Sequence, residues 1–137
     1  MRVPGCITAI VIDDNEDICD VFSEFLEIIG VVVLGAARNG KDGFELFEKA
    51  RPDIVFLDWM MPEFDGKYAL DRIHQTETNS FITILVSEDP ADIMHKLERQ
   101  PDKIIKKPFE VDEIRKIIEQ VRSGGGPRQY SCSTPPA

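Results

Sequence analysis

The sequence predicts a doubly wound α/β fold, in which a five-stranded parallel sheet carries helices on both of its faces. Patterns typical of a strand and of an amphipathic helix alternate along the chain five times. The connections between them are short, which favours parallel strands joined by helical crossovers. Two of the apolar runs end abruptly on carboxylates, at Asp13-Asp14 and at Asp58. Open α/β sheets bind their ligands at that end of their strands.

The first strand–helix pair is expected over residues 7–12 and 17–29. The strand is a continuous apolar run, and the helix repeats Ile, Val, Phe and Leu at helical spacing. Asn15 or Asp17 is expected to cap the start of this helix, and Gly30 to end it.

The second pair is expected over residues 31–37 and 41–50. The third begins with the apolar run 54–57, which reads as a buried parallel strand. The turn signal Asp65-Gly66 then leads into a helix over residues 67–76.

The fourth pair is a strand over residues 81–86 and a helix over 91–100, which starts behind Pro90. This helix is expected to be short or displaced, because little chain separates it from the next strand. The last pair is a strand over 103–106 and a helix over 111–122 with an apolar stripe of isoleucine and valine.

The composition indicates one domain of a cytoplasmic protein. The 137 residues suffice for one core, assigned here to residues 1–123. Residues 124–137 are rich in Gly, Ser and Pro without an apolar period, and we expect a disordered tail. No apolar run is long enough for a membrane span, and the first residues do not resemble a signal peptide. The cysteines have no metal-ligand spacing, so Cys6 and Cys19 are expected to be reduced core thiols.

The net charge of −9 argues against a nucleic-acid partner, because phosphate binding needs a basic surface. One small basic patch exists at Lys103, Lys106 and Lys107. A docking site is one explanation of this patch. Lysines on an edge strand also prevent unwanted pairing with other strands, and this explanation fits the patch equally well.

The acidic strand ends predict a metal site. Asp13, Asp14 and Asp58 would meet at one sheet edge, where three like charges repel unless a cation neutralises them. Mg²⁺ is the expected ion, because it prefers oxygen ligands and keeps several waters. Asp13 and Asp14 are alternatively helix-capping residues, which does not exclude metal binding.

Two further polar groups follow the fourth and fifth strands. Ser87 places a hydroxyl at the end of the fourth strand, and Lys107 places an ammonium after the fifth. Both would point to the same sheet edge as the acids. A turn residue and a solvated lysine are the plain alternatives, and His74 and His95 read as surface histidines.

Taken in order, these motifs resemble the receiver domains of two-component response regulators. The resemblance covers roughly residues 7–122 and rests on five motifs at strand ends. They are Asp13-Asp14, Leu57-Asp58 with Met61-Pro62, Asp65-Gly66, Ser87, and Lys107-Pro108-Phe109. It implies a flavodoxin-like sheet with strand order 2-1-3-4-5 and a cis bond before Pro108.

The resemblance also implies roles for the site. Asp58 would accept a phosphoryl group, and Asp13, Asp14, Asp58 and the backbone carbonyl of Met60 would bind Mg²⁺. Independently of the family, a carboxylate can act as a nucleophile toward a phosphoryl group, and charge neutralisation then supplies most of the catalysis. Ser87 and Lys107 would contact the phosphoryl oxygens.

The implied phosphoryl donor is a histidine kinase or phosphotransfer protein. The implied output is binding of a downstream protein through the fourth helix, fifth strand and fifth helix. The sequence predicts a stand-alone regulator, not an enzyme, that is a monomer or a weak phosphorylation-dependent dimer.

Two residues depart from the family pattern. Ile104 stands where an aromatic residue usually reports phosphorylation, so the usual coupling to the hydroxyl is in doubt. Glu88 adds negative charge beside the path of the phosphoryl group, and we expect slower phosphotransfer.

Two other functions remain open at this point. One is a pseudo-receiver that binds partners without phosphorylation. The other is a small Mg²⁺ phosphatase with an aspartyl nucleophile, but such enzymes carry a second Asp where this chain has Met60.

Overall fold

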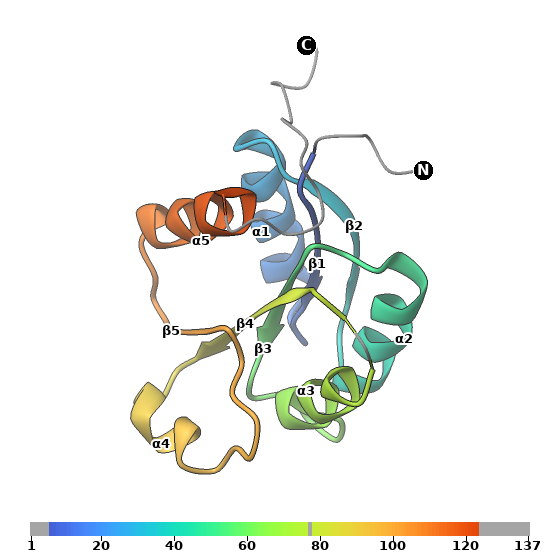
Figure 1. Cartoon of the computed structure of the whole chain (residues 1–137), viewed down its shortest axis with the longest axis vertical. Helices are drawn as coiled ribbons and strands as arrows, with labels where there is room; N and C mark the ends of the chain where they lie inside the picture. The colour runs from blue at the N-terminus through green and yellow to red at the C-terminus, as the bar shows by residue number, and fades with distance from the viewer. Residues whose placement is uncertain (1–5, 77, 124–137) are drawn as a thin grey trace.

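The computed structural model describes residues 6–76 and 78–123 and contains a five-stranded parallel sheet in the order β2-β1-β3-β4-β5. The strands are β1 (Thr8–Ile12), β2 (Val32–Ala37), β3 (Ile54–Asp58), β4 (Phe81–Val86) and β5 (Lys103–Lys106). The helices are α1 (Glu16–Ile28), α2 (Gly40–Ala50), α3 (Gly66–His74), α4 (Pro90–Met94) and α5 (Val111–Ser123). The predicted fold class, strand order and alternation of elements are confirmed (Figure 1).

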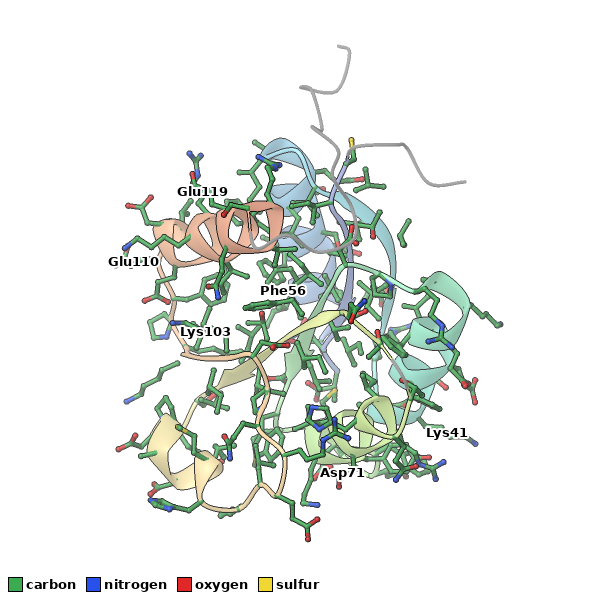
Figure 2. The ribbon with its side chains drawn as sticks, in the orientation of Figure 1. Lys41, Phe56, Asp71, Lys103, Glu110 and Glu119 are labelled. Atoms are coloured by element: carbon green, nitrogen blue, oxygen red, sulfur yellow. The ribbon has the colours of Figure 1, made fainter. Side chains whose placement is uncertain are left out.

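The helices divide between the two faces of the sheet. Apolar side chains of α1 and α5 pack on one face, and those of α2, α3 and α4 pack on the other. Phe56 of the central strand β3 is fully buried on the α1–α5 side, where its ring meets Phe22 at 4.9 Å between centroids (Figure 2). Burial on both faces explains why β1 and β3 are continuous apolar runs.

Short polar side chains begin four of the helices. Asn15, Asn39, Asp65 and Asp89 each accept a hydrogen bond from a backbone N–H in the first turn of the helix that follows. Of the two predicted caps for α1, Asn15 is the one used, through a 3.1 Å bond from Ile18 N–H.

The helix predicted over residues 91–100 is short, in line with the little chain that separates it from β5, but it ends about six residues before the predicted end. α4 ends at Met94, and the chain tightens into turns, with Lys96 N–H donating to the carbonyl of Ile93. The side-chain amide of Gln100 then donates to the carbonyls of Met94 and Leu97, at 3.0 and 3.4 Å. These contacts supply partners that further helical turns would otherwise have provided.

The cysteine prediction is half right. Cys19 is a free, buried thiol in α1, whereas Cys6 is disulfide-bonded and lies just before β1. Spacing alone could not reveal this bond, because a pairing depends on three-dimensional proximity.

The predicted tail, residues 124–137, lies outside the described residues. Within the described part of the chain, no helix combines the length and apolar character that a membrane span requires.

Candidate functional site

Adjacent parallel strands bring three carboxylates together at the carboxyl edge of the sheet. β1 pairs with β3 so that Ile12 lies opposite Leu57. Asp13 follows Ile12 and Asp58 follows Leu57, so both acids lie at the same edge of the sheet. Asp13, Asp14 and Asp58 each offer an oxygen, and these oxygens all lie within 4.8 Å of one another. Asp13 and Asp58 are buried, whereas Asp14 is exposed. This donor set, hard oxygens with one side open to water, suits Mg²⁺.

Lys107 bridges the two buried acids. Its Nζ donates a 2.8 Å hydrogen bond to Asp58 Oδ1 and lies 3.6 Å from Asp13 Oδ2. The backbone N–H of Lys107 donates to the carbonyl of Val86 at 2.7 Å, which anchors the residue to the end of β4. The bond between Lys107 and Pro108 is cis, as predicted.

Burial and neighbouring charge shift the titration of this pair. Burial raises the pKa of Asp58 above its ordinary value, and the charge of Asp13 adds to the rise, while the hydrogen bond from Lys107 opposes it. Burial alone would lower the pKa of Lys107, but its hydrogen bond to Asp58 and the negative charges of Asp58 and Asp13 raise it overall. Lys107 is therefore a permanent cation at neutral pH, beside a carboxylate whose charged form is disfavoured.

Backbone contacts hold the two buried acids in place. Asp13 N–H donates to the carbonyl of Ala37 at 3.0 Å, and Asp13 Oδ1 accepts a 3.0 Å bond from Asn15 N–H. Beyond Asp58, Trp59 N–H donates to the carbonyl of Leu85 at 3.0 Å. The bond from Asn15 N–H therefore fixes the orientation of the Asp13 carboxylate, while β1 fixes the position of its backbone. The sequence does not predict this bond.

Gly66 allows α3 to start directly against the end of β3. Its N–H donates to the Trp59 carbonyl at 3.0 Å, and a Cβ at this position would come within 2.7 Å of the Asp58 carbonyl oxygen. In the sequence, Asp65-Gly66 indicates only a turn, so this close packing was not predicted.

Four other residues singled out in the sequence make no hydrogen bond to Asp13, Asp14 or Asp58 among the contacts of the described residues. Ser87 follows β4 directly and is exposed, and Met60 is 62% exposed. Glu88 is half-buried. Ile104 is half-buried and packs into the core on the α2–α3–α4 face, as strand alternation predicts.

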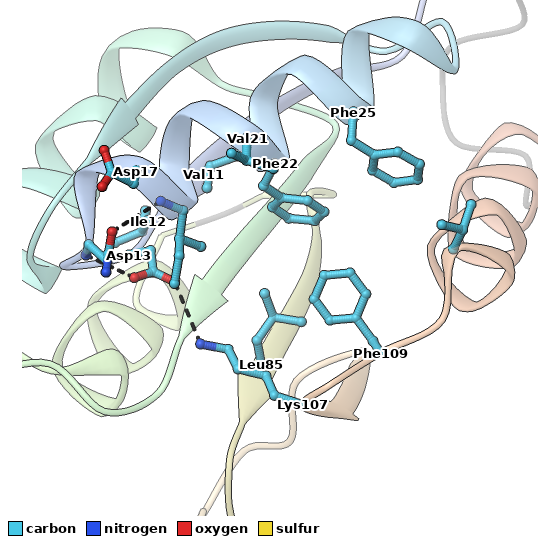
Figure 3. A pocket seen from close by; sticks show the side chains of 13 residues that line it. Val11, Ile12, Asp13, Asp17, Val21, Phe22, Phe25, Leu85, Lys107 and Phe109 are labelled. Carbon is cyan, nitrogen blue, oxygen red and sulfur yellow. Dashed lines mark hydrogen bonds and ion pairs between the residues drawn. The ribbon is translucent and has the colours of Figure 1, made fainter.

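An apolar pocket of about 510 Å³ opens beside the acids, between α1 and the segment that leads into α5. Figure 3 shows Phe22 of α1 facing Phe109, with Asp13 and Lys107 at one end of the pocket, and Phe25 also lines it. Its rim carries Ile18 and Val21, which are 45% and 66% exposed. Such exposed apolar side chains around a hollow are typical of binding surfaces.

The geometry suits acceptance of a phosphoryl group on a carboxylate. The Asp58 carboxylate, at the end of a buried strand, has the chemistry of a nucleophile, and two further acids offer oxygen atoms that could hold a divalent cation. Lys107 supplies a fixed positive charge next to the nucleophile. Phosphoryl transfer needs this combination, because the incoming group is already rich in negative oxygens.

Comparison with known proteins identifies the family. The profile of the response regulator receiver domain family matches residues 9–119. Nitrate/nitrite response regulator protein NarL of Escherichia coli (strain K12) is 29% identical over 119 residues, which cover 85% of this chain and 55% of NarL. The probable transcriptional regulator ycf27 of Porphyridium aerugineum is 32% identical over 112 residues, covering 82% of this chain and 46% of that protein. The chain spans about half the length of the curated relatives it matches.

Solved structures share the fold. The receiver domain of the putative response regulator NarL from Mycobacterium tuberculosis superposes with a TM-score of 0.77 at 23% identity, over 88% of this chain and 99% of that one. The response regulator domain of Thermotoga maritima CheB gives 0.73 at 22% identity, over 85% and 96% of the two chains.

These findings define the class as receiver domains, the signalling switches of two-component systems. This chain belongs to the response regulator receiver domain family. Members of the family use Mg²⁺, and the acidic cluster of Asp13, Asp14 and Asp58 fits that use.

Proposed function

We propose that the domain accepts a phosphoryl group on Asp58, in a reaction that requires Mg²⁺, and thereby switches the binding of a partner protein. One observation carries the proposal: Lys107 reaches both Asp58 and Asp13 at an edge where three carboxylates converge. The arrangement combines a nucleophile, oxygen ligands for a cation and a fixed positive charge within one small site.

Each residue has a separate role in this proposal. Asp13, Asp14 and Asp58, together with the Met60 carbonyl, would hold the ion, which supplies neutralisation of the developing charge. Asp58 would attack phosphorus in line with the leaving group, forming an acyl phosphate. Lys107 would exchange part of its bond to Asp58 for a phosphoryl oxygen, and Ser87 would donate to another through its hydroxyl.

The phosphoryl donor is proposed to be a histidine kinase or a phosphotransfer protein. The apolar pocket beside Asp13 and Lys107 supports approach of a protein donor from this side, because its exposed rim would be buried by the docked partner. A small donor would bypass that contact and depend on the acids and Lys107 alone.

The output is proposed to be protein binding in the cytoplasm. The stand-alone arrangement and the absence of a nucleic-acid partner stay predictions. Relatives carry names such as "Probable transcriptional regulator ycf27", and a solved neighbour is described as a DNA-binding response regulator. The mass of the protein in extracts of its source cells tests the stand-alone arrangement directly.

Trp59 provides the test, since it adjoins Asp58 and is 7% exposed. We expect its fluorescence to change with Mg²⁺ and again when beryllium fluoride, a phosphoryl mimic, is added. Both changes should vanish in Asp58→Asn and persist in Asp71→Asn, an exposed acid on α3.

Other outcomes would identify the alternatives. No response to either addition would contradict the switch and favour an interaction module that is not controlled by phosphorylation. Repeated turnover of a phosphomonoester would favour the phosphatase.

A further inference from the structure

The peptide bond between Asp13 and Asp14 joins two of the three carboxylates in the candidate metal site. The Asp13 carboxylate is held on both oxygens, by Asn15 N–H at 3.0 Å and by Lys107 Nζ at 3.6 Å (Figure 3). Asp14 is exposed, and its side chain makes no hydrogen bond or ion pair among the described residues. The direction of the Asp14 carboxylate therefore depends on how the preceding peptide is oriented.

A buried thiol on α1 holds this peptide. Cys19 Sγ donates to the Asp13 carbonyl at 3.3 Å and lies 3.9 Å from the carbonyl oxygen of Ala37. Ala37 is the last residue of β2 and also accepts Asp13 N–H at 3.0 Å. The thiol therefore lies where the ends of β1 and β2 meet α1.

The position of the thiol is itself well fixed. Cys19 is 3% exposed, so little water can compete for the Asp13 carbonyl. Its own N–H donates to the Asn15 carbonyl at 3.0 Å, in the first turn of α1. A donor carried by a helix is placed more precisely than one carried by a loop.

We propose that Cys19 is a positioning residue for the Mg²⁺ site, where its thiol fixes the peptide between Asp13 and Asp14 and thereby orients the Asp14 carboxylate. A peptide unit is planar, so a bond to the Asp13 carbonyl also fixes the nitrogen of Asp14. Cys19 itself touches neither the ion nor the phosphoryl group. The proposal rests on the proposed function and deepens it, because it assigns a residue to the Mg²⁺ binding that the function requires.

Packing is the other role of a buried cysteine, since a thiol fills space as a small apolar group does. A packing role predicts that the loss of volume lowers stability and that Mg²⁺ affinity does not depend on a donor. A positioning role predicts that Mg²⁺ affinity follows the presence of a donor. The two roles are therefore separable by variants of similar size.

The test measures the Mg²⁺ affinity of the whole chain through Trp59 fluorescence, together with its unfolding in urea. Cys19→Ala removes the donor and should weaken Mg²⁺ binding by about threefold, the effect of one weak hydrogen bond. Cys19→Ser is about as small as the Ala variant but keeps an O–H donor, so it should bind Mg²⁺ more tightly than Cys19→Ala. The matched control Leu26→Val shortens a fully buried side chain near the other end of α1 and should lower stability with unchanged Mg²⁺ affinity.

The S–H stretching band in the infrared spectrum reports the hydrogen bond without Mg²⁺. The loss of one such band in Cys19→Ala assigns that band to Cys19. We expect its frequency to lie below that of a thiol in an apolar solvent, because donation to a carbonyl weakens the S–H bond. A band at the frequency of the unbonded thiol would refute the contact and the proposal with it.

Equal Mg²⁺ affinity in Cys19→Ala and the unaltered chain would also overturn the proposal. Equally weakened binding in Cys19→Ser or in Leu26→Val would do the same, because it would assign the effect to lost packing.

Failure of the proposed function has a different signature. If the unaltered chain gives no response to Mg²⁺, the metal site is wrong and the positioning role of Cys19 falls with it. If the unaltered chain binds Mg²⁺ and Cys19→Ala binds it equally well, only the role of Cys19 is wrong.

Discussion

Replacing Gly66 by Ala should displace the phosphoryl acceptor without unfolding the domain. A Cβ at Gly66 would lie 2.7 Å from the Asp58 carbonyl oxygen, 2.8 Å from Trp59 Cα and 2.9 Å from an atom of the Trp59 ring. Ordinary contact begins at 3.4 Å, so α3 and the end of β3 must separate by roughly 0.7 Å. Two of these three neighbours are backbone atoms and cannot rotate away.

The displacement has a cost in stability and a cost in activity. Overpacking of this kind costs about 1–3 kcal/mol, against a gain of up to about 1 kcal/mol because Ala favours the helix. We expect the free energy of unfolding to fall by about 1–2 kcal/mol. Misplacement of a reacting group by about 1 Å lowers rates by up to about 100-fold, so phosphorylation of Asp58 should slow by about tenfold or more.

The assay combines urea unfolding with the rate of phosphorylation by acetyl phosphate, followed through Trp59 fluorescence. Gly35→Ala is the matched control, because its added Cβ meets only the flexible side chain of Leu46, at 3.1 Å or more. A normal rate and stability in Gly66→Ala, or equal damage in Gly35→Ala, would refute the reasoning.

Three further predictions concern the charges and the core. Lys107→Ala should slow phosphorylation by about 100-fold because it removes the fixed positive charge, whereas the neighbouring Lys106→Ala should leave the rate unchanged. Burial raises the pKa of Asp58 in the folded protein, so at pH values above that pKa the ionised carboxylate lowers the free energy of unfolding. This loss of stability disappears as the pH falls through the raised pKa. Asp58→Asn should therefore raise the thermal unfolding midpoint at neutral pH without Mg²⁺, with no gain in acid; a gain that persists in acid contradicts this. The Thr83 hydroxyl is buried and has no hydrogen-bond partner among residues 6–76 and 78–123, so Thr83→Val should add about 1 kcal/mol to the free energy of unfolding in urea, and a loss would reveal a partner.

The architecture could be predicted because its signals are local. Buried parallel strands are continuous apolar runs, and helix starts are marked by short polar residues such as Asn15 and Asp65. The gathering of Asp13, Asp14 and Asp58 followed from the strand ends alone, since neighbouring parallel strands finish at one edge.

What could not be predicted depends on contacts between distant segments. α4 ends early at Met94, where the side chain of Gln100 binds its carbonyls, and helical periodicity does not encode such a contact. The disulfide of Cys6 likewise depends on proximity in space. The close packing of Gly66 on Asp58 was hidden, because a glycine in a turn motif gives no indication of what lies against it.

The most direct test of the central claim is to locate the phosphoryl group after reaction with acetyl phosphate. Borohydride reduction of the acyl phosphate followed by peptide mass spectrometry should mark Asp58 alone, and only when Mg²⁺ is present during phosphorylation. Labelling of another residue, or equal labelling of Asp58 without a divalent cation, would contradict the account.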